Sequence, residues 1–131
     1  MSIQVGWLVN VQVGGGPRLP AAGTLDVDAY DMVKVEVASG ADAMEVSLQP
    51  STGDEVKLLM LHASSFSEDL TYSINASEAD VAKRFALDGP HLLVGSGALA
   101  LLGDPPQRLF LYNGGIDAAQ LSVLVGRDAT P

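Results

Sequence analysis

Apolar and polar positions alternate along much of the chain. The clearest run places apolar residues at odd-numbered positions only: Ile3, Val5, Trp7, Val9, Val11 and Val13. Successive side chains of a β-strand point to opposite faces, so a period of two predicts a strand with one buried face. We expect these odd positions, Trp7 included, to face the core. The same reasoning predicts strands over residues 24–28, 33–37, 44–49, 56–61, 70–74, 92–102, 107–113 and 121–125.

Turn-forming residues separate these runs. Residues 14–17, 50–54 and 103–106 combine Gly, which tolerates positive φ angles, with Pro, which fixes φ. Many short strands between such turns predict an all-β fold, an antiparallel two-sheet β-sandwich of the jelly-roll kind with about eight strands. A closed barrel is the alternative. One domain should span residues 1–131, because this is a common domain length.

One segment departs from the alternation. Ser77 stands at a helix-capping position with an acid three residues later, and Val81 and Phe85 are four residues apart. This spacing predicts at most one short helix, near residues 77–86. A polar crossover loop between the two sheets is the alternative.

Two strands are apolar on both faces. In the run 56–61, Leu59 and Leu61 stand opposite Leu58 and Met60, and in the run 107–112, Phe110 and Tyr112 stand opposite Leu109 and Leu111. We therefore expect 56–61, together with the apolar run 92–102, to be central in its sheet. A sandwich buries only one face of each sheet, so the second apolar face needs a cover. Our interface candidates are Leu59, Leu61, Phe110 and Tyr112, with residues 77–90 as the alternative cover.

The composition also favours self-association. Hydrophobic residues make up 47% of the chain and charged residues only 18%, which leaves a small domain with few charges for its surface. The net charge of −9 is spread without a basic cluster, so nucleic acid and anionic membranes are not expected as partners. We expect the chain to form a homo-oligomer.

The chain has no cysteine, which excludes disulfides and thiolate chemistry. The first residues lack the charged and apolar regions of a signal peptide, and residues 92–102 are too few to span a bilayer. These features predict a cytoplasmic protein without a cofactor.

Two histidines are the candidate catalytic residues. A hydrolase would pair His62 or His91 with a nearby serine and an acid such as Asp69 or Asp88. No nucleophile-elbow motif accompanies them. We therefore expect no catalytic residue and no enzyme activity, and a backbone-bonded or solvated role for both histidines.

Three carboxylates lie within six residues, at Asp26, Asp28 and Asp31. Calcium binds such oxygen ligands, but the spacing does not fit an EF-hand loop. We regard them as weak metal candidates and expect no metal site. Residues 14–22 and 26–31 are the candidate walls of a ligand site at one end of the domain.

The sequence as a whole favours a non-catalytic structural or assembly module, a self-associating β-sandwich subunit of a larger particle. The first alternative is a β-sandwich that binds a small ligand or metal with its end loops. The second is a hydrolase-like enzyme that uses His62 or His91.

Overall fold

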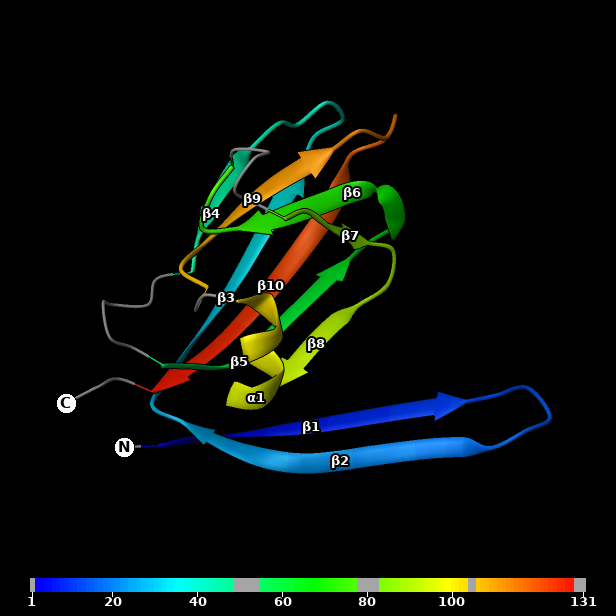
Figure 1. Ribbon diagram of the computed structural model, residues 1–131, viewed down its shortest axis with the longest axis vertical. Coiled ribbons are helices and arrows are strands. Elements are labelled where there is room, and N and C mark those ends of the chain that lie inside the picture. The colour runs from blue at the N-terminus through cyan, green and yellow to red at the C-terminus, as the bar shows by residue number, and fades with distance from the viewer. Residues whose placement is uncertain (1, 49–54, 78–82, 104–105, 129–131) are drawn as a thin grey trace.

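Ten strands in three antiparallel sheets dominate the computed structural model, which describes residues 2–48, 55–77, 83–103 and 106–128 (Figure 1). The elements in chain order are β1 (Ile3–Gln12), β2 (Arg18–Val27), β3 (Ala29–Val37), β4 (Met44–Ser47), β5 (Glu55–Ala63), β6 (Ser67–Ile74), β7 (Phe85–Leu87), β8 (His91–Val94), α1 (Ser96–Leu99), the 3-10 helix η1 (Ala100–Leu102), β9 (Arg108–Asn113) and β10 (Ala119–Asp128). The predicted all-β class is confirmed.

Eight of the strands form a two-sheet sandwich. The first sheet has the order β3-β10-β5-β8 and the second has the order β4-β9-β6-β7. Strand β3 pairs with β10, β4 with β9, β5 with β8 and β6 with β7, so each outer pair encloses the next. This nesting is a long hairpin rolled into two sheets, which is the jelly-roll arrangement. The predicted sandwich is therefore confirmed.

The core lies between the two sheets. Partners across a ladder share a face, and Leu61, Val123 and Val33 form one such row on the inner side of the first sheet. Residues from the second sheet that meet them include Leu109, Leu111 and Tyr72, all almost fully buried. Alternate residues of each strand thus build the core, as the period of two requires.

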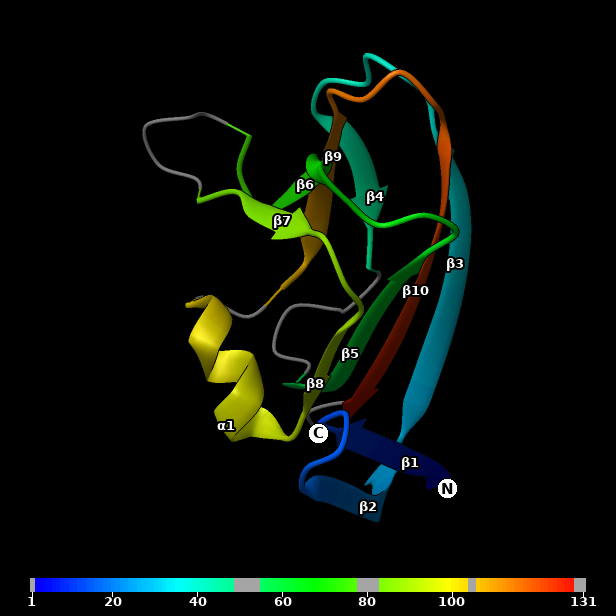
Figure 2. The ribbon, with the colours of Figure 1, turned by 90° about the vertical axis from the view of Figure 1, so that its right-hand side faces the viewer.

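The run 92–102 is not the central strand that the sequence predicted. It forms the short edge strand β8 and then turns into α1 and η1. Gly95, at φ 91°, ends the strand in a conformation that favours glycine. Helix α1 then covers the lower part of the first sheet, beside the second sheet (Figure 2), with Leu99 buried in the core. The prediction that residues 56–61 are central is confirmed by β5, between β10 and β8.

The helix predicted near residues 77–86 is not found in the described part of that segment. Residues 78–82 lie outside the described residues, and Phe85–Leu87 forms strand β7. The ring of Phe85 lies 5.4 Å from that of Tyr72, and Leu87 is buried in the core. Residues 85 and 87 therefore follow the period of a strand.

Strands β1 and β2 form a two-stranded hairpin that projects from one end of the sandwich (Figures 1 and 2). We call this hairpin, residues 3–27, the arm. The prediction that the odd residues of 3–13 face the core is wrong, because none of them belongs to the core. Trp7 is half-buried by its own arm, where it lies over Gly23 so closely that a Cβ there would come 2.8 Å from the ring. The alternation correctly indicated a strand, but not what covers it.

Candidate interaction surface

The interface candidates of strand β5 lie in the core. Leu59 and Leu61 are both 0% exposed, so they cannot contact another subunit. Because both faces of this strand are apolar, the sequence could not tell which one enters the core. Met60 and Leu58 point the other way, toward the outer face of the first sheet.

The interface candidates of strand β9 are covered by the chain itself. Tyr112 is buried beneath Arg84, whose guanidinium carbon lies 3.5 Å from the ring centroid. The Tyr112 hydroxyl donates a hydrogen bond of 3.1 Å to the Ser77 carbonyl. Phe110 is half-buried, with the Arg108 guanidinium carbon 5.7 Å from its ring centroid. These aromatic residues do not form an exposed pair, and the alternative cover by residues 77–90 accounts for Tyr112.

The outer face of the first sheet is apolar at the end nearest the arm. Two neighbouring rows cross its four strands, and their partners share one side of the sheet. We call the following seven residues of these rows the outer apolar face: Tyr30, Met32, Leu58, Met60, Leu92, Val94 and Leu124. The next row, Lys34, Ser122 and His62, is polar. The apolar surface therefore has a sharp boundary halfway along the sheet.

Two shallow hollows lie in the outer apolar face on either side of Leu124. One, of about 250 Å³, is lined by Met32, Met60 and Leu124 with the polar row beyond them. The other, of about 380 Å³, lies where the root of β1 meets the sheet, between Ile3 and Val5 of the arm and Tyr30 of β3. Leu124 lines both hollows, which are therefore neighbours on this face.

The arm has an apolar face of its own. Ladder partners Val11–Leu19, Val9–Ala21, Trp7–Gly23 and Val5–Leu25 share one side of the hairpin. Near the root this side is covered, and Val27 is fully buried, whereas toward the tip Val11 is 57% and Leu19 is 74% exposed. The distal half of the apolar side therefore has no cover within the chain.

Exposed hydrophobic side chains are concentrated on the arm and the strand that follows it. The described residues include ten large hydrophobic residues that are exposed, and seven of them precede residue 33. These seven are Ile3, Leu8, Val11, Val13, Leu19, Tyr30 and Met32. The arm and the outer apolar face thus form the candidate interaction surface.

Polar contacts hold the root of the arm to the sandwich. The Asp28 amide donates to the Arg127 carbonyl at 2.9 Å and to the Asp128 carboxylate at 3.1 Å. Lys57 pairs with the same carboxylate at 2.5 Å, and this contact raises the pKa of the Lys57 ammonium. Arg127 pairs with Asp31. The arm therefore projects from an anchored base.

These contacts also settle where the predicted metal candidates lie. Asp26 sits on β2 opposite Gln4, Asp28 follows the end of that strand, and Asp31 is paired with Arg127. Within the described ranges, no three acidic or histidine residues converge as a metal site would require. Residues 18–22, predicted as a loop wall, belong to strand β2.

The two histidines lie in different surroundings. His91 Nδ1 shares a hydrogen bond of 2.6 Å with the Tyr72 hydroxyl, and burial raises the pKa of Tyr72 to about 12. His62 lies on the outer side of β5, edge-on to the Phe66 ring at 5.4 Å. Among the described residues, neither histidine is hydrogen-bonded to a serine or a carboxylate. The geometry does not bring together the triad that the hydrolase alternative would require.

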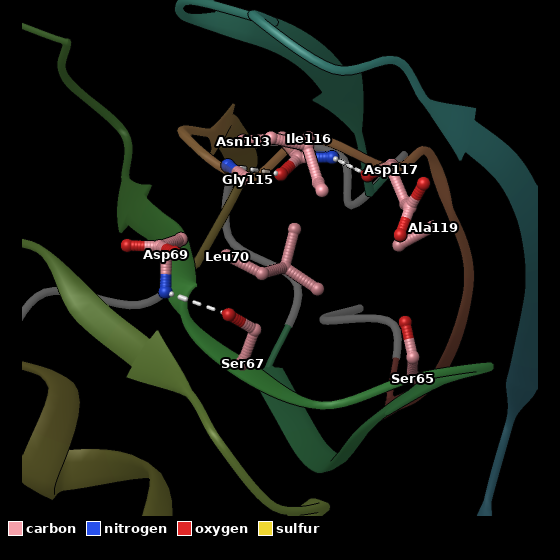
Figure 3. A pocket seen from close by; sticks show the side chains of 9 residues that line it. All are labelled: Ser65, Ser67, Asp69, Leu70, Asn113, Gly115, Ile116, Asp117 and Ala119. Carbon is pink, nitrogen blue, oxygen red and sulfur yellow. Dashed lines mark hydrogen bonds between the residues drawn. The ribbon is translucent and has the colours of Figure 1, made fainter.

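A pocket of about 210 Å³ opens among the loops at the opposite end of the domain (Figure 3). Its lining includes Ser67, Asp69, Asn113 and Asp117. The buried Asn113 side chain donates to the carbonyls of Val37 and Asp117 at 3.0 and 2.9 Å, and accepts from the Gly115 amide at 3.0 Å. The polar atoms of the Asn113 side chain are therefore hydrogen-bonded within the protein. The pocket is also smaller than the roughly 300 Å³ typical of ligand sites.

Comparisons with protein families, curated proteins and solved structures find no match to this chain. In the part of the chain that the structure describes, no helix is long and apolar enough to cross a membrane. The candidate interaction surface is therefore identified from the geometry of this chain alone.

The sequence contained a signal for the arm that the strand-by-strand analysis missed. Apolar and small residues recur at alternate positions on both sides of the turn at 14–17, over ten residues of each strand. The Val13 amide closes this turn with a bond of 2.9 Å to the Pro17 carbonyl. Two runs of equal length around a Gly-rich turn are typical of a hairpin.

Proposed function

We propose that the protein is a non-catalytic assembly module, a self-associating β-sandwich subunit. The observation that supports this best is the arm, a long hairpin with an uncovered apolar side toward its tip. The neighbouring outer apolar face is also exposed at Tyr30 and Met32, although its Leu58 is buried. The jelly roll itself is used for many purposes, so the fold adds no argument about function.

The energetics of a hairpin favour a partner for the arm. A two-stranded hairpin alone is at best marginally stable in water, because it has no second layer to bury its apolar side. Contiguous apolar surface on a protein typically marks an interaction site. A partner that covered the distal side would stabilise the arm by burial at roughly 25 cal/mol per Å² of apolar area.

Light scattering on a size-exclusion column tests this proposal. At about 100 μM, well above the dissociation constants of modest interfaces, we expect a mass of at least two subunits. Replacing Val11→Glu and Leu19→Glu together should shift the mass to one subunit, because it places two charges on the apolar side of the arm. A wild-type protein that is monomeric at this concentration would refute the proposal.

The matched control is Leu101→Glu. Leu101 is 79% exposed in η1, which belongs neither to the arm nor to the outer apolar face, so it receives the same kind of change. This variant should keep the wild-type mass. Loss of association in the control as well would show that added charge, and not the arm, is responsible.

A further inference from the structure

We infer that the arm of one subunit docks, by its apolar side, on the outer apolar face of a second copy of the chain. This inference rests on the proposed self-association and names the surface that receives the arm. Both surfaces are apolar and partly exposed. Val11 and Leu19 of the arm are 57% and 74% exposed, and Tyr30 and Met32 of the outer apolar face are 53% and 55% exposed, whereas Leu58 of that face is buried. One contact of this kind covers both.

The dimensions of the two surfaces match. Ten residues per strand give an arm about 33 Å long, and the four strands of the first sheet span about 15 Å between the outer axes. The arm is therefore long enough to cross all four strands. Exposed side chains at its tip, such as Leu19, would lie against a surface with hollows on both sides of Leu124.

The distribution of charge also favours this contact. The first 25 residues carry a single charged side chain, Arg18, so the remainder of the chain has a net charge of −10 within the total of −9. Two copies of the acidic body repel each other. Most of the arm carries no acidic side chain. It can therefore approach the acidic body of a second copy without this repulsion.

The buried area favours an arm on a sheet over an arm on an arm. The uncovered distal half of the apolar side covers roughly 170 Å² in plan, from about 17 Å of length and about 10 Å of width. Arm-to-arm contact would use this strip alone and leave both outer apolar faces in water. Reciprocal exchange, with two-fold symmetry, covers one arm and an equal strip of sheet face per subunit, which is about twice the area of arm-to-arm contact.

Variants of the receiving surface test the inference. Met32→Glu and Leu92→Glu together change the two edge strands of the outer apolar face and leave the arm intact. We expect this face variant to run as one subunit in light scattering at about 100 μM, as the arm variant does, with an unchanged circular dichroism spectrum. A face variant that keeps the wild-type mass would overturn the inference while leaving the proposed self-association intact.

Cysteine cross-linking provides a second measurement that does not depend on disrupting the contact. Because the chain has no cysteine, Leu19→Cys and Met32→Cys can be prepared as separate proteins and mixed under oxidation. The mixture should give a covalent pair containing one of each protein. Efficient cross-linking of the Leu19→Cys protein to itself, with none to Met32→Cys, would show arm-to-arm contact and overturn the inference. A monomeric wild-type protein would overturn both proposals.

Discussion

Tyr72 makes a polar contact that joins the two sheets beside their apolar core. Its hydroxyl, on β6 of the second sheet, reaches His91 on β8 of the first at 2.6 Å. The side chain is 2% exposed and its ring lies against Phe85. Such a buried hydroxyl needs its partner, because an unsatisfied polar group costs about 1–3 kcal/mol.

The titration of Tyr72 predicts a loss of stability in alkali. Burial raises the pKa of the folded hydroxyl from 10.0 to about 12, so the unfolded chain releases this proton first as the pH rises. The contribution of the protonated Tyr72 hydroxyl to the free energy of unfolding is complete below pH 10. It falls between pH 10 and 12, by on the order of 2 kcal/mol. Urea unfolding at pH 9 and pH 11.5 should show this fall in the wild-type protein and a smaller one in Tyr72→Phe. Equal falls in both proteins would contradict it.

At the scale of whole elements, alternation was a reliable guide where a strand had one polar face. Strands β3 and β10 are correctly predicted by their alternate apolar residues alone, Val33 and Val35 in β3 and Leu121 and Val123 in β10. Alternation predicts that a strand has one apolar face, but not what packs against that face. For this reason the sequence prediction placed residues 3–13 of the arm in the core. It also failed for the run 92–102, where hydrophobic content was high but glycine at position 95 ended the strand. Short strand β7 was missed because three residues cannot establish a period.

Excision of the arm is expected to leave the sandwich folded. Deleting residues 2–25 removes no residue of the core cluster and keeps Val27, the arm residue that is fully buried. The truncated protein should retain a β-type circular dichroism spectrum and a cooperative thermal transition. It should also lose self-association. Unfolding of the truncated chain would show that the arm stabilises its own body in a way that this packing does not explain.

Considered as a whole molecule, the protein combines an acidic body with an apolar surface at one end. The composition correctly suggested apolar surface beyond the core, but the residues chosen for it were inner or internally covered ones. Assigning Met32, Tyr30 and the arm required the register of four strands, which brings together residues from 30 to 124. The spacing of residues in the sequence does not show which residues of different strands lie side by side.

Salt should strengthen the association. Two copies with a net charge of −9 repel each other, and this repulsion extends about 30 Å at 0.01 M salt but only about 8 Å at 0.15 M. Apolar contacts are not weakened by this screening. Sedimentation velocity at about 10 mM and about 300 mM NaCl should therefore show a higher fraction of complex at the higher salt. A lower fraction there would mean that attraction between charges holds the subunits together.

The nested pairing of the sandwich has a consequence for the order in which the chain can fold during synthesis. Strand β10 is the only neighbour of β3 in the first sheet of the described structure, so β3 is unpaired until residues 119–128 have been made, whereas β5 can pair earlier with β8. At ~10 residues per second, β3 waits several seconds with its valines exposed. Non-local pairing of this kind also folds slowly, in milliseconds to seconds. The arm pairs only with itself, so both of its strands are available long before the body, but a lone hairpin is at best marginally stable until it has a second layer.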